Sequence, residues 1–367
     1  MGLNIKDIIS RKEIEISDLK GKTLCVDAFN ALYQFLSTIR QYDGTPLMDS
    51  HKNITSHLSG IFYRNIALLD EGIKLIYVFD GKAPDLKSKV HKKRQDVRDV
   101  AEEKYEEAKQ SEDLGGMKRY SSQLVRLTDE MIKESKELLE AMGIAVVQAP
   151  GEGEAQAAYL ARVDPNIYAS VSQDYDSLLF GAPKLIRNLN LSRKKKTFSG
   201  YVEVFPEIIE LDKVLNQLGI NLDQLICIGI LVGTDYNPKG VPGIGQKKAL
   251  ELVKKFEQPV LIFNELKERI NSLPVEDQFD WKEIFELFHK PSVIEPENLV
   301  CTDFNIIKKD SNECIGGKII FPRVNENKIK EILVERHEFS DERIDKQIEK
   351  LAGIKEKSNQ KGLDKWF

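Results

Sequence analysis

The sequence predicts an α/β fold with a central, mainly parallel, twisted sheet flanked by helices. Residues 22–27 and 74–80 each form a short apolar run that ends in an aspartate and is followed by a helical stretch. Residues 168–171 form a third strand-like run, with aspartates a few residues after it. Such repetition indicates βαβ units, in which the carboxyl ends of parallel strands gather at one edge of the sheet. Side chains that follow these runs are therefore expected to share one site.

Composition narrows the class of protein. The 367 residues are 41% hydrophobic and 31% charged, which suits one large or two ordinary globular domains. No apolar run reaches membrane-spanning length, so no membrane is expected among the partners. The four cysteines lack C-x-x-C spacing, which favours reduced thiols in an intracellular compartment. The net charge of −5 does not by itself indicate a nucleic-acid binder, but basic groups cluster at 82–98, 193–196 and 239–255. Each cluster is either a local positive surface or a solvated face.

Carboxylates are concentrated in residues 150–181. Glu152 and Glu154 lie in a glycine-containing loop that enters an alanine-rich helical run, and Asp174 and Asp176 follow the run 168–171. Residues two apart in extended chain point to the same side, so both aspartates are expected to aim at one place. Like charges converge only with a cation between them, and oxygen ligands suit Mg2+ or Mn2+. The pattern predicts a divalent-metal site, with a solvated acidic loop as the alternative.

Asp27 and Asp80 end the first two apolar runs and are expected at the same edge of the sheet. Either one alone could cap the following helix. Together with the two pairs in 150–181 they favour the metal site. The five histidines form neither a ligand pattern nor a catalytic triad.

Residues 81–141 are highly charged and helical, with an interruption near Gly115 and Gly116. Lys87 and Arg94 are seven residues apart and would lie on one helix face. The segment is either a salt-bridged surface pair of helices or a mobile basic arch. Positive side chains of an arch could hold a phosphate beside the carboxylates.

Residues 241–249, VPGIGQKKA, have the form of a DNA-binding helical hairpin. An apolar helix over 222–233 leads into a loop that carries Asp235 and the glycines Gly243 and Gly245. These glycines allow backbone N–H groups at the next helix to face a phosphate, and neighbouring lysines add charge. The lysines are Lys247 and Lys248.

The remaining segments are less specific. Strand-like pieces are expected at 184–191 and 198–205, joined by a basic turn at 193–196, and helices at 281–288 and 341–351. Residues 352–362 are polar and lysine-rich, which predicts a flexible segment. The closing QKGLDKWF would place four side chains on one side of a short 3₁₀ turn, either docked on the chain's own core or offered to a partner. They are Gln360, Leu363, Trp366 and Phe367.

These motifs together resemble the structure-specific 5′ nucleases of the XPG type, and within them the flap endonucleases. The resemblance runs nearly end to end, through MGL, CVDAFNALYQFL, YVFDGKAPDLK, APGEGEAQAAYL, SQDYDSLLFG, GTDY, GIGQKKAL, FSDERI and QKGLDKWF. It implies that seven carboxylates hold two Mg2+ ions, with Mn2+ as a possible substitute. They are Asp27, Asp80, Glu152, Glu154, Asp174, Asp176 and Asp235.

The resemblance also implies roles for residues outside the acidic cluster. Lys87 and Arg94 look like the basic catalytic pair on the arch, and Tyr33 like the aromatic residue that stacks on a base near the cleavage point. Gly2 would lie beside the active site. Positions lining a pocket for a one-nucleotide 3′ flap match Arg40 and Thr55.

The same resemblance implies partners. The hairpin would bind downstream duplex, with K+ as a possible ligand. The tail matches a sliding-clamp box in which Trp366 replaces the commoner Phe. The chain is expected to be a monomer, and its end at the clamp box resembles archaeal members, which favours the cytoplasm; a eukaryotic source would favour the nucleus.

The implied domain organisation is one nuclease domain over 1–351, followed by a tail over 352–367 with the clamp motif. Within the domain, we expect an N-terminal part at about 1–98, a helical arch at about 82–135, an internal part at about 120–257 and a C-terminal helical wrap at about 258–351.

The implied reaction is two-metal hydrolysis of a DNA phosphodiester at the base of a 5′ flap, with 5′–3′ exonuclease activity, in Okazaki-fragment maturation and base excision repair. The alternatives are a 5′ exonuclease or bubble-cutting nuclease of the same superfamily, a non-catalytic DNA-binding clamp adaptor, and a small RNA-cleaving nuclease of related sheet topology.

Overall fold

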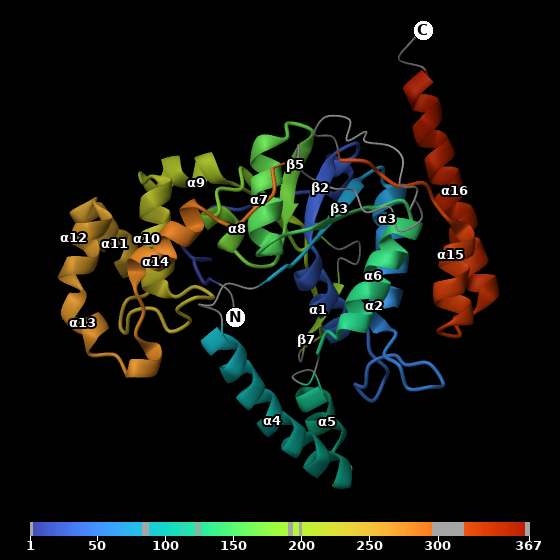
Figure 1. Ribbon diagram of the computed structural model, residues 1–367, viewed down its shortest axis with the longest axis horizontal. Coiled ribbons are helices and arrows are strands. Elements are labelled where there is room, and N and C mark those ends of the chain that lie inside the picture. Colours follow the sequence, from blue (N-terminus) through green and yellow to red (C-terminus); the bar gives the residue numbers. More distant parts are fainter. Residues whose placement is uncertain are drawn as a thin grey trace.

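The sheet has seven strands in the order β1-β9-β6-β5-β2-β3-β4 (Figure 1). The computed structural model describes residues 3–82, 88–111, 113–121, 124, 126–189, 194–197, 200–295 and 319–363. The strands of the sheet are β1 Lys12–Glu13, β2 Thr23–Asp27, β3 Lys74–Phe79, β4 Ala145–Gln148, β5 Ile167–Val171, β6 Lys184–Arg187 and β9 Glu207–Glu210. Neighbours from β6 to β4 are parallel, and β9 and β1 add an antiparallel edge. The predicted mainly parallel sheet is confirmed.

Both faces of the sheet are buried. Successive strand residues point to opposite faces, and the residues on each face are apolar. In β2, Leu24 and Val26 join one core, whereas Cys25, a buried free thiol, joins the other. The first core lies under α1, α3, α6 and α16, and the second lies under α7. The helices on these faces are α1 Ala28–Thr38, α2 Ser56–Ser59, the π-helix η2 Gly60–Arg64, α3 Asn65–Asp70, α6 Asp129–Ala141, α7 Gly153–Val163, α15 Glu326–Lys330, the π-helix η6 Glu331–Glu335 and α16 Asp341–Leu363.

A third core joins the sheet edge to a group of short helices at one end of the molecule (Figure 1). These helices are α8 Asp176–Leu179, α9 Leu211–Leu218, α10 Leu222–Val232, α11 Gln246–Phe256, α12 Pro259–Glu265, α13 Lys267–Asn271 and α14 Trp281–His289. The described residues also include two short 3₁₀ helices, η1 Ile16–Leu19 and η4 Val275–Asp277. Within the described ranges no single helix could span a membrane; α9 and α10 together have the length and composition, but they are bent by 84°.

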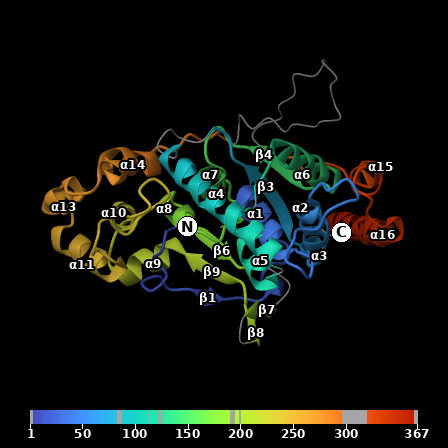
Figure 2. The same cartoon turned by 90° about the horizontal axis from the view of Figure 1, so that it is seen from below.

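The charged segment forms a helical arch that projects from the body on the side where α1 begins (Figure 1). It consists of α4 Ser88–Gln110 and α5 Leu114–Ser121. From below, the pair lies across the sheet between the α10–α14 group and the helices α15 and α16 (Figure 2). Helix α4 ends at Gln110 and α5 begins at Leu114, so Gly115 and Gly116 belong to α5 and the predicted interruption is displaced by a few residues.

One local prediction needs correction. The basic stretch predicted as a turn at 193–196 instead contributes to β7 Lys194–Thr197, which pairs with β8 Gly200–Glu203 in a separate antiparallel sheet. The segment 352–362 continues α16 as far as Leu363, and its flexibility stays a prediction. It contains no proline and is rich in residues that form helices readily, so propensity outweighs its polarity.

Candidate active site

Two aspartates occupy the carboxyl ends of neighbouring strands. Asp27 ends β2 and caps α1, where its Oδ1 accepts a hydrogen bond of 3.1 Å from the Asn30 N–H. Asp80 directly follows β3, and its Oδ1 accepts a hydrogen bond of 2.6 Å from the Gly153 N–H. Because Gly153 begins α7 and Glu152 is its N-cap residue, this bond joins the end of β3 to the loop of the glutamate pair.

Asp174 and Asp176 lie at the same edge of the sheet, but the backbone between them differs from the prediction. The expected extended chain is wrong, because Tyr175 has helical backbone angles (φ −89°, ψ −3°) and Asp176 begins α8. Asp174 lies in the preceding turn, where its Oδ2 accepts a hydrogen bond of 3.2 Å from Asn30 Nδ2. Asn30 also accepts from the Gln173 N–H at 3.2 Å, so one amide orients the turn after β5.

The pKa of Glu154 reports how close the other carboxylates lie. Burial raises its pKa well above the ordinary value, and repulsion from Asp176, Asp27 and Asp174 raises it further. The hydroxyl and the N–H of Ser177 donate to Glu154 Oε1 at 2.8 and 2.9 Å and act in the opposite direction. The hydrogen bonds place the same groups together, because Asn30, whose N–H Asp27 caps, holds Asp174, and Ser177, directly after Asp176, holds Glu154. Four carboxylates from β2, α7, the turn after β5 and the start of α8 therefore lie close to one another.

The hairpin loop approaches this cluster through Tyr236. Burial raises the pKa of the Tyr236 hydroxyl well above its ordinary value, and the nearby carboxylates of Glu152, Asp176 and Glu154 raise it further. Asp235 directly precedes Tyr236 in this loop. Asn237 fixes the loop, because its Oδ1 accepts from the Thr234 N–H and hydroxyl and its Nδ2 donates to the Ile230 carbonyl.

The second half of the hairpin has the predicted geometry. Gly243 takes the left-handed region (φ 75°), and Gly245 is the N-cap residue of α11. Lys247 and Lys248 are exposed on the first turn of α11. The free N–H groups of a helix start and these lysines form a surface suited to a phosphate.

The donor set fits a hard divalent ion, because every clustered ligand candidate is a carboxylate. Among the described residues, no three acidic, histidine or cysteine side chains are arranged as a complete metal-binding group. The carboxylates that would supply the ligands instead receive hydrogen bonds from Gly153, Asn30 and Ser177.

Other predicted site residues fall in different places. Tyr33 lies on α1 and is 41% exposed, as a stacking platform requires. Arg40 donates to the Gly44 carbonyl at 2.7 Å and to Ser121 of the arch, and Thr55 is buried at the start of α2. Several predictions fall outside what the structure describes, either whole residues or their side chains. They concern Gly2, Lys87, Arg94, Gln360, Leu363, Trp366 and Phe367.

Sequence reasoning missed Asn30, Ser177 and Tyr236, which hold or border the carboxylates. The available signals are positional. Asn30 stands three residues after a strand-end aspartate, and Ser177 and Tyr236 each directly follow a predicted ligand.

Comparisons with known proteins identify the family. The XPG N-terminal domain matches residues 3–101, and the XPG I-region matches residues 143–235. Flap endonuclease 1 of Staphylothermus marinus is 47% identical, and the alignment covers 100% of both chains. The chain belongs to the flap endonuclease 1 family.

Other proteins named flap endonuclease 1 are similar to this chain in sequence and in structure. The protein of that name from Pyrococcus furiosus is 45% identical over 100% of this chain and 99% of its own. The solved flap endonuclease-1 from Methanococcus jannaschii has a TM-score of 0.70 and 38% identity, covering 96% of this chain and 98% of its own. The catalytic core of Rad2 in complex with DNA substrate has a TM-score of 0.64 at 22% identity, over 96% of this chain and 100% of its own, a likeness of fold alone.

Proposed function

We propose that this chain is a structure-specific 5′ flap endonuclease that hydrolyses a DNA phosphodiester at the base of a 5′ flap and also has 5′–3′ exonuclease activity. The observation that carries the proposal is the convergence of Asp27, Glu154, Asp174 and Asp176 at the carboxyl ends of parallel strands, where Asn30 and Ser177 hold them by hydrogen bonds. Membership of a family of divalent-metal-dependent nucleases gives this convergence its chemistry. The role would be Okazaki-fragment maturation and base excision repair, in the cytoplasm of an archaeal cell and as a monomer.

The seven carboxylates would hold two Mg2+ ions, or Mn2+, with Asp80 and Glu152 among the ligands. When bound, such ions lower the pKa of water and stabilise charge on the attacked phosphate. The chain's own groups orient the ligands: Asn30 holds Asp174, and the Gly153 N–H holds Asp80. Tyr236 stays protonated because its pKa is raised, and it can donate to Glu152.

Groups around the cluster would bind the DNA. Lys87 and Arg94 would offset negative charge on the phosphate, and Tyr33 would stack on a base beside it. The exposed start of α11, with Lys247 and Lys248, would bind the backbone of the downstream duplex. A K+ ion would bind at the turn from Gly243 to Gly245. Arg40 and Thr55 would line a separate pocket for a single 3′ nucleotide.

Cleavage of an end-labelled DNA with a 5′ flap and a one-nucleotide 3′ flap tests the proposal. We expect a cut one nucleotide inside the duplex in Mg2+ and none in excess chelator. Stepwise loss of single nucleotides would instead indicate the exonuclease relative. Tight binding without cleavage in either Mg2+ or Mn2+ would indicate the clamp adaptor.

Removal of residues 360–367 tests the clamp motif. We expect the truncated chain to cleave naked flap DNA as the full chain does, because the acidic cluster is elsewhere, and to lose stimulation by the sliding clamp. The measurement is the cleavage rate with and without the clamp. Unchanged stimulation would exclude the assignment of the tail.

A further inference from the structure

His337 joins two elements that are far apart in sequence. It lies in the turn between η6 and α16 and is only 7% exposed. Its Nδ1 lies 3.0 Å from Asp49 Oδ2, and its Nε2 lies 2.9 Å from Glu134 Oε1 of α6. A neutral imidazole carries one N–H and can donate to one carboxylate only, whereas an imidazolium donates to both. The geometry is therefore that of a protonated histidine between two carboxylates.

Asp49 belongs to the loop 41–54, which is folded as two small turns. Bridges pair Arg40 with Pro46 and Met48 with Ile54. Next to Asp49, the N–H and hydroxyl of Ser50 donate to Glu338, the neighbour of His337. The loop is thus fastened to the C-terminal segment by two adjacent residues of that segment.

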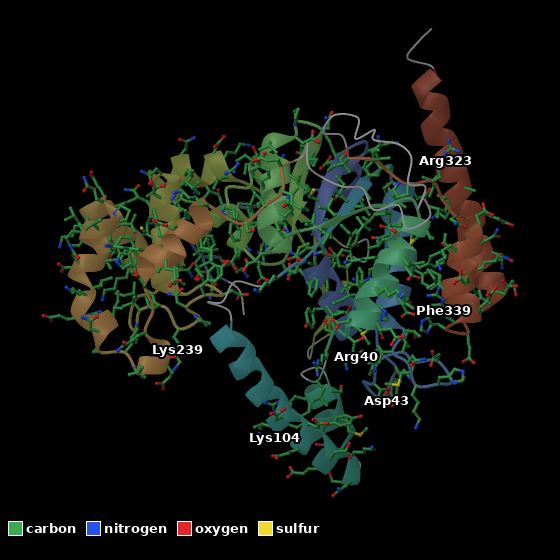
Figure 3. The ribbon with its side chains drawn as sticks, viewed as in Figure 1. Arg40, Asp43, Lys104, Lys239, Arg323 and Phe339 are labelled. Atoms are coloured by element: carbon green, nitrogen blue, oxygen red, sulfur yellow. The ribbon has the colours of Figure 1, made fainter. Side chains whose placement is uncertain are left out.

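The opposite end of the same loop holds the arch. Arg40 Nη1 donates to the Gly44 carbonyl at 2.7 Å and to the hydroxyl of Ser121 at 2.9 Å, and Ser121 donates in turn to the Gly44 carbonyl. Ser121 is the last residue of α5 and is buried. In Figure 3, Arg40 and Asp43 lie between Lys104 of the arch and Phe339 of the C-terminal segment.

We propose that His337 is a positioning residue for the nuclease reaction: it fixes the loop 41–54, and this loop anchors the end of α5 through Arg40 and Ser121. The proposal rests on the proposed function, because a fixed arch matters only to an enzyme that threads or grips DNA there. Its consequence is that the charge on His337 controls how firmly the arch is held.

The sign of the pH effect follows from the groups around His337. The hydrogen bond with Glu134 raises the pKa of His337, burial opposes this, and the bond with Asp49 raises it again. The bridge is therefore complete below the ordinary histidine pKa of about 6.5 and is lost as pH rises through the higher folded value. Burial alone would raise the pKa of Asp49, but bonds from His337 and Asn53 lower it to about 2.

The neighbouring groups whose pKa is shifted keep one charge state while the bridge titrates. Burial lowers the pKa of His57 on α2 to about 4, so this imidazole stays neutral. Hydrogen bonds from Ser50 lower the pKa of Glu338, and Arg336, which faces Glu134, remains charged. His51, which faces Glu338 from the loop, is a second histidine and supplies the matched control.

Hydrogen–deuterium exchange of the full chain without DNA, corrected for intrinsic rates, tests the proposal from about pH 6 to about pH 9. In the wild type we expect protection of 41–54 and of α5 to fall about tenfold as pH rises, since a buried charge-assisted bond is lost. His337→Gln should show that lower protection at every pH. His337→Lys, whose ammonium stays charged, should keep protection at every pH, and His51→Gln should behave as the wild type.

Cleavage under single-turnover conditions gives the second readout. His337→Gln should raise the DNA concentration for half-maximal rate about tenfold, because a loosely held arch grips DNA less firmly. The proposal is overturned if His337→Gln retains the pH response, if His51→Gln abolishes it, or if the loop loosens while α5 does not. If no chain cleaves, the wild type included, the proposed function fails, and the exchange data still decide the role of His337.

Discussion

Asp174→Asn is expected to abolish cleavage, by about a thousandfold or more, and to leave binding of flap DNA nearly unchanged. Asparagine has the same shape and can still accept the bond from Asn30 Nδ2 through its amide oxygen. It removes one negative charge from the ligand set, which weakens the hold on a divalent ion. It also relieves repulsion on Glu154, so the fold should not lose stability.

Single-turnover cleavage and fluorescence anisotropy on the same DNA separate the two effects. Asp212→Asn makes the same change of charge at an exposed position of α9 and should alter neither quantity. Loss of DNA binding by Asp174→Asn, with normal cleavage of each bound complex, would contradict the role assigned to Asp174.

The strand ends could be predicted from the sequence because their signal is local. In β2, apolar residues on both faces and a closing aspartate identify a buried strand and the edge where it ends. The same reasoning places Asp80 after β3. The hairpin could also be predicted from the sequence, because the glycines Gly243 and Gly245 indicate a tight turn before the next helix.

Other features depend on contacts between distant residues, for which the sequence has no local sign. Asn30 orients Asp174 across 144 positions, and His337 meets Asp49 across 288. The aspartate pair follows the strand-like run 168–171, so extended chain is expected there, and nothing local in the sequence marks the helical turn at Tyr175. The structure brings four of the seven predicted carboxylates together, their role as metal ligands stays a prediction, and the backbone predicted for the aspartate pair is wrong.

Gly81→Ala is expected to lower the cleavage rate about a hundredfold, because the change moves two ligand candidates relative to each other. The N–H of Gly81 donates to the Gly151 carbonyl at 2.6 Å, which brings the end of β3 close to the loop before Glu152. A Cβ at this position would lie 2.2 Å from the Ala149 carbonyl oxygen. Both contacts are with backbone, so the two segments must separate, and Asp80 must shift away from Glu152.

The control is Gly353→Ala in α16, where a Cβ meets no atom within 4 Å. Alanine there should leave cleavage unchanged and stabilise the helix by roughly 0.5–1 kcal/mol. Circular dichroism melts and cleavage rates of both variants distinguish displacement of the ligands from loss of folding. A folded Gly81→Ala chain with reduced cleavage agrees with displacement. Full activity in that variant would mean that the spacing between the end of β3 and the glutamate loop does not limit the reaction. Metal titration adds a further distinction, because a displaced Asp80 should raise the Mg2+ concentration for half-maximal rate, whereas loss of folding would lower the maximal rate at every concentration.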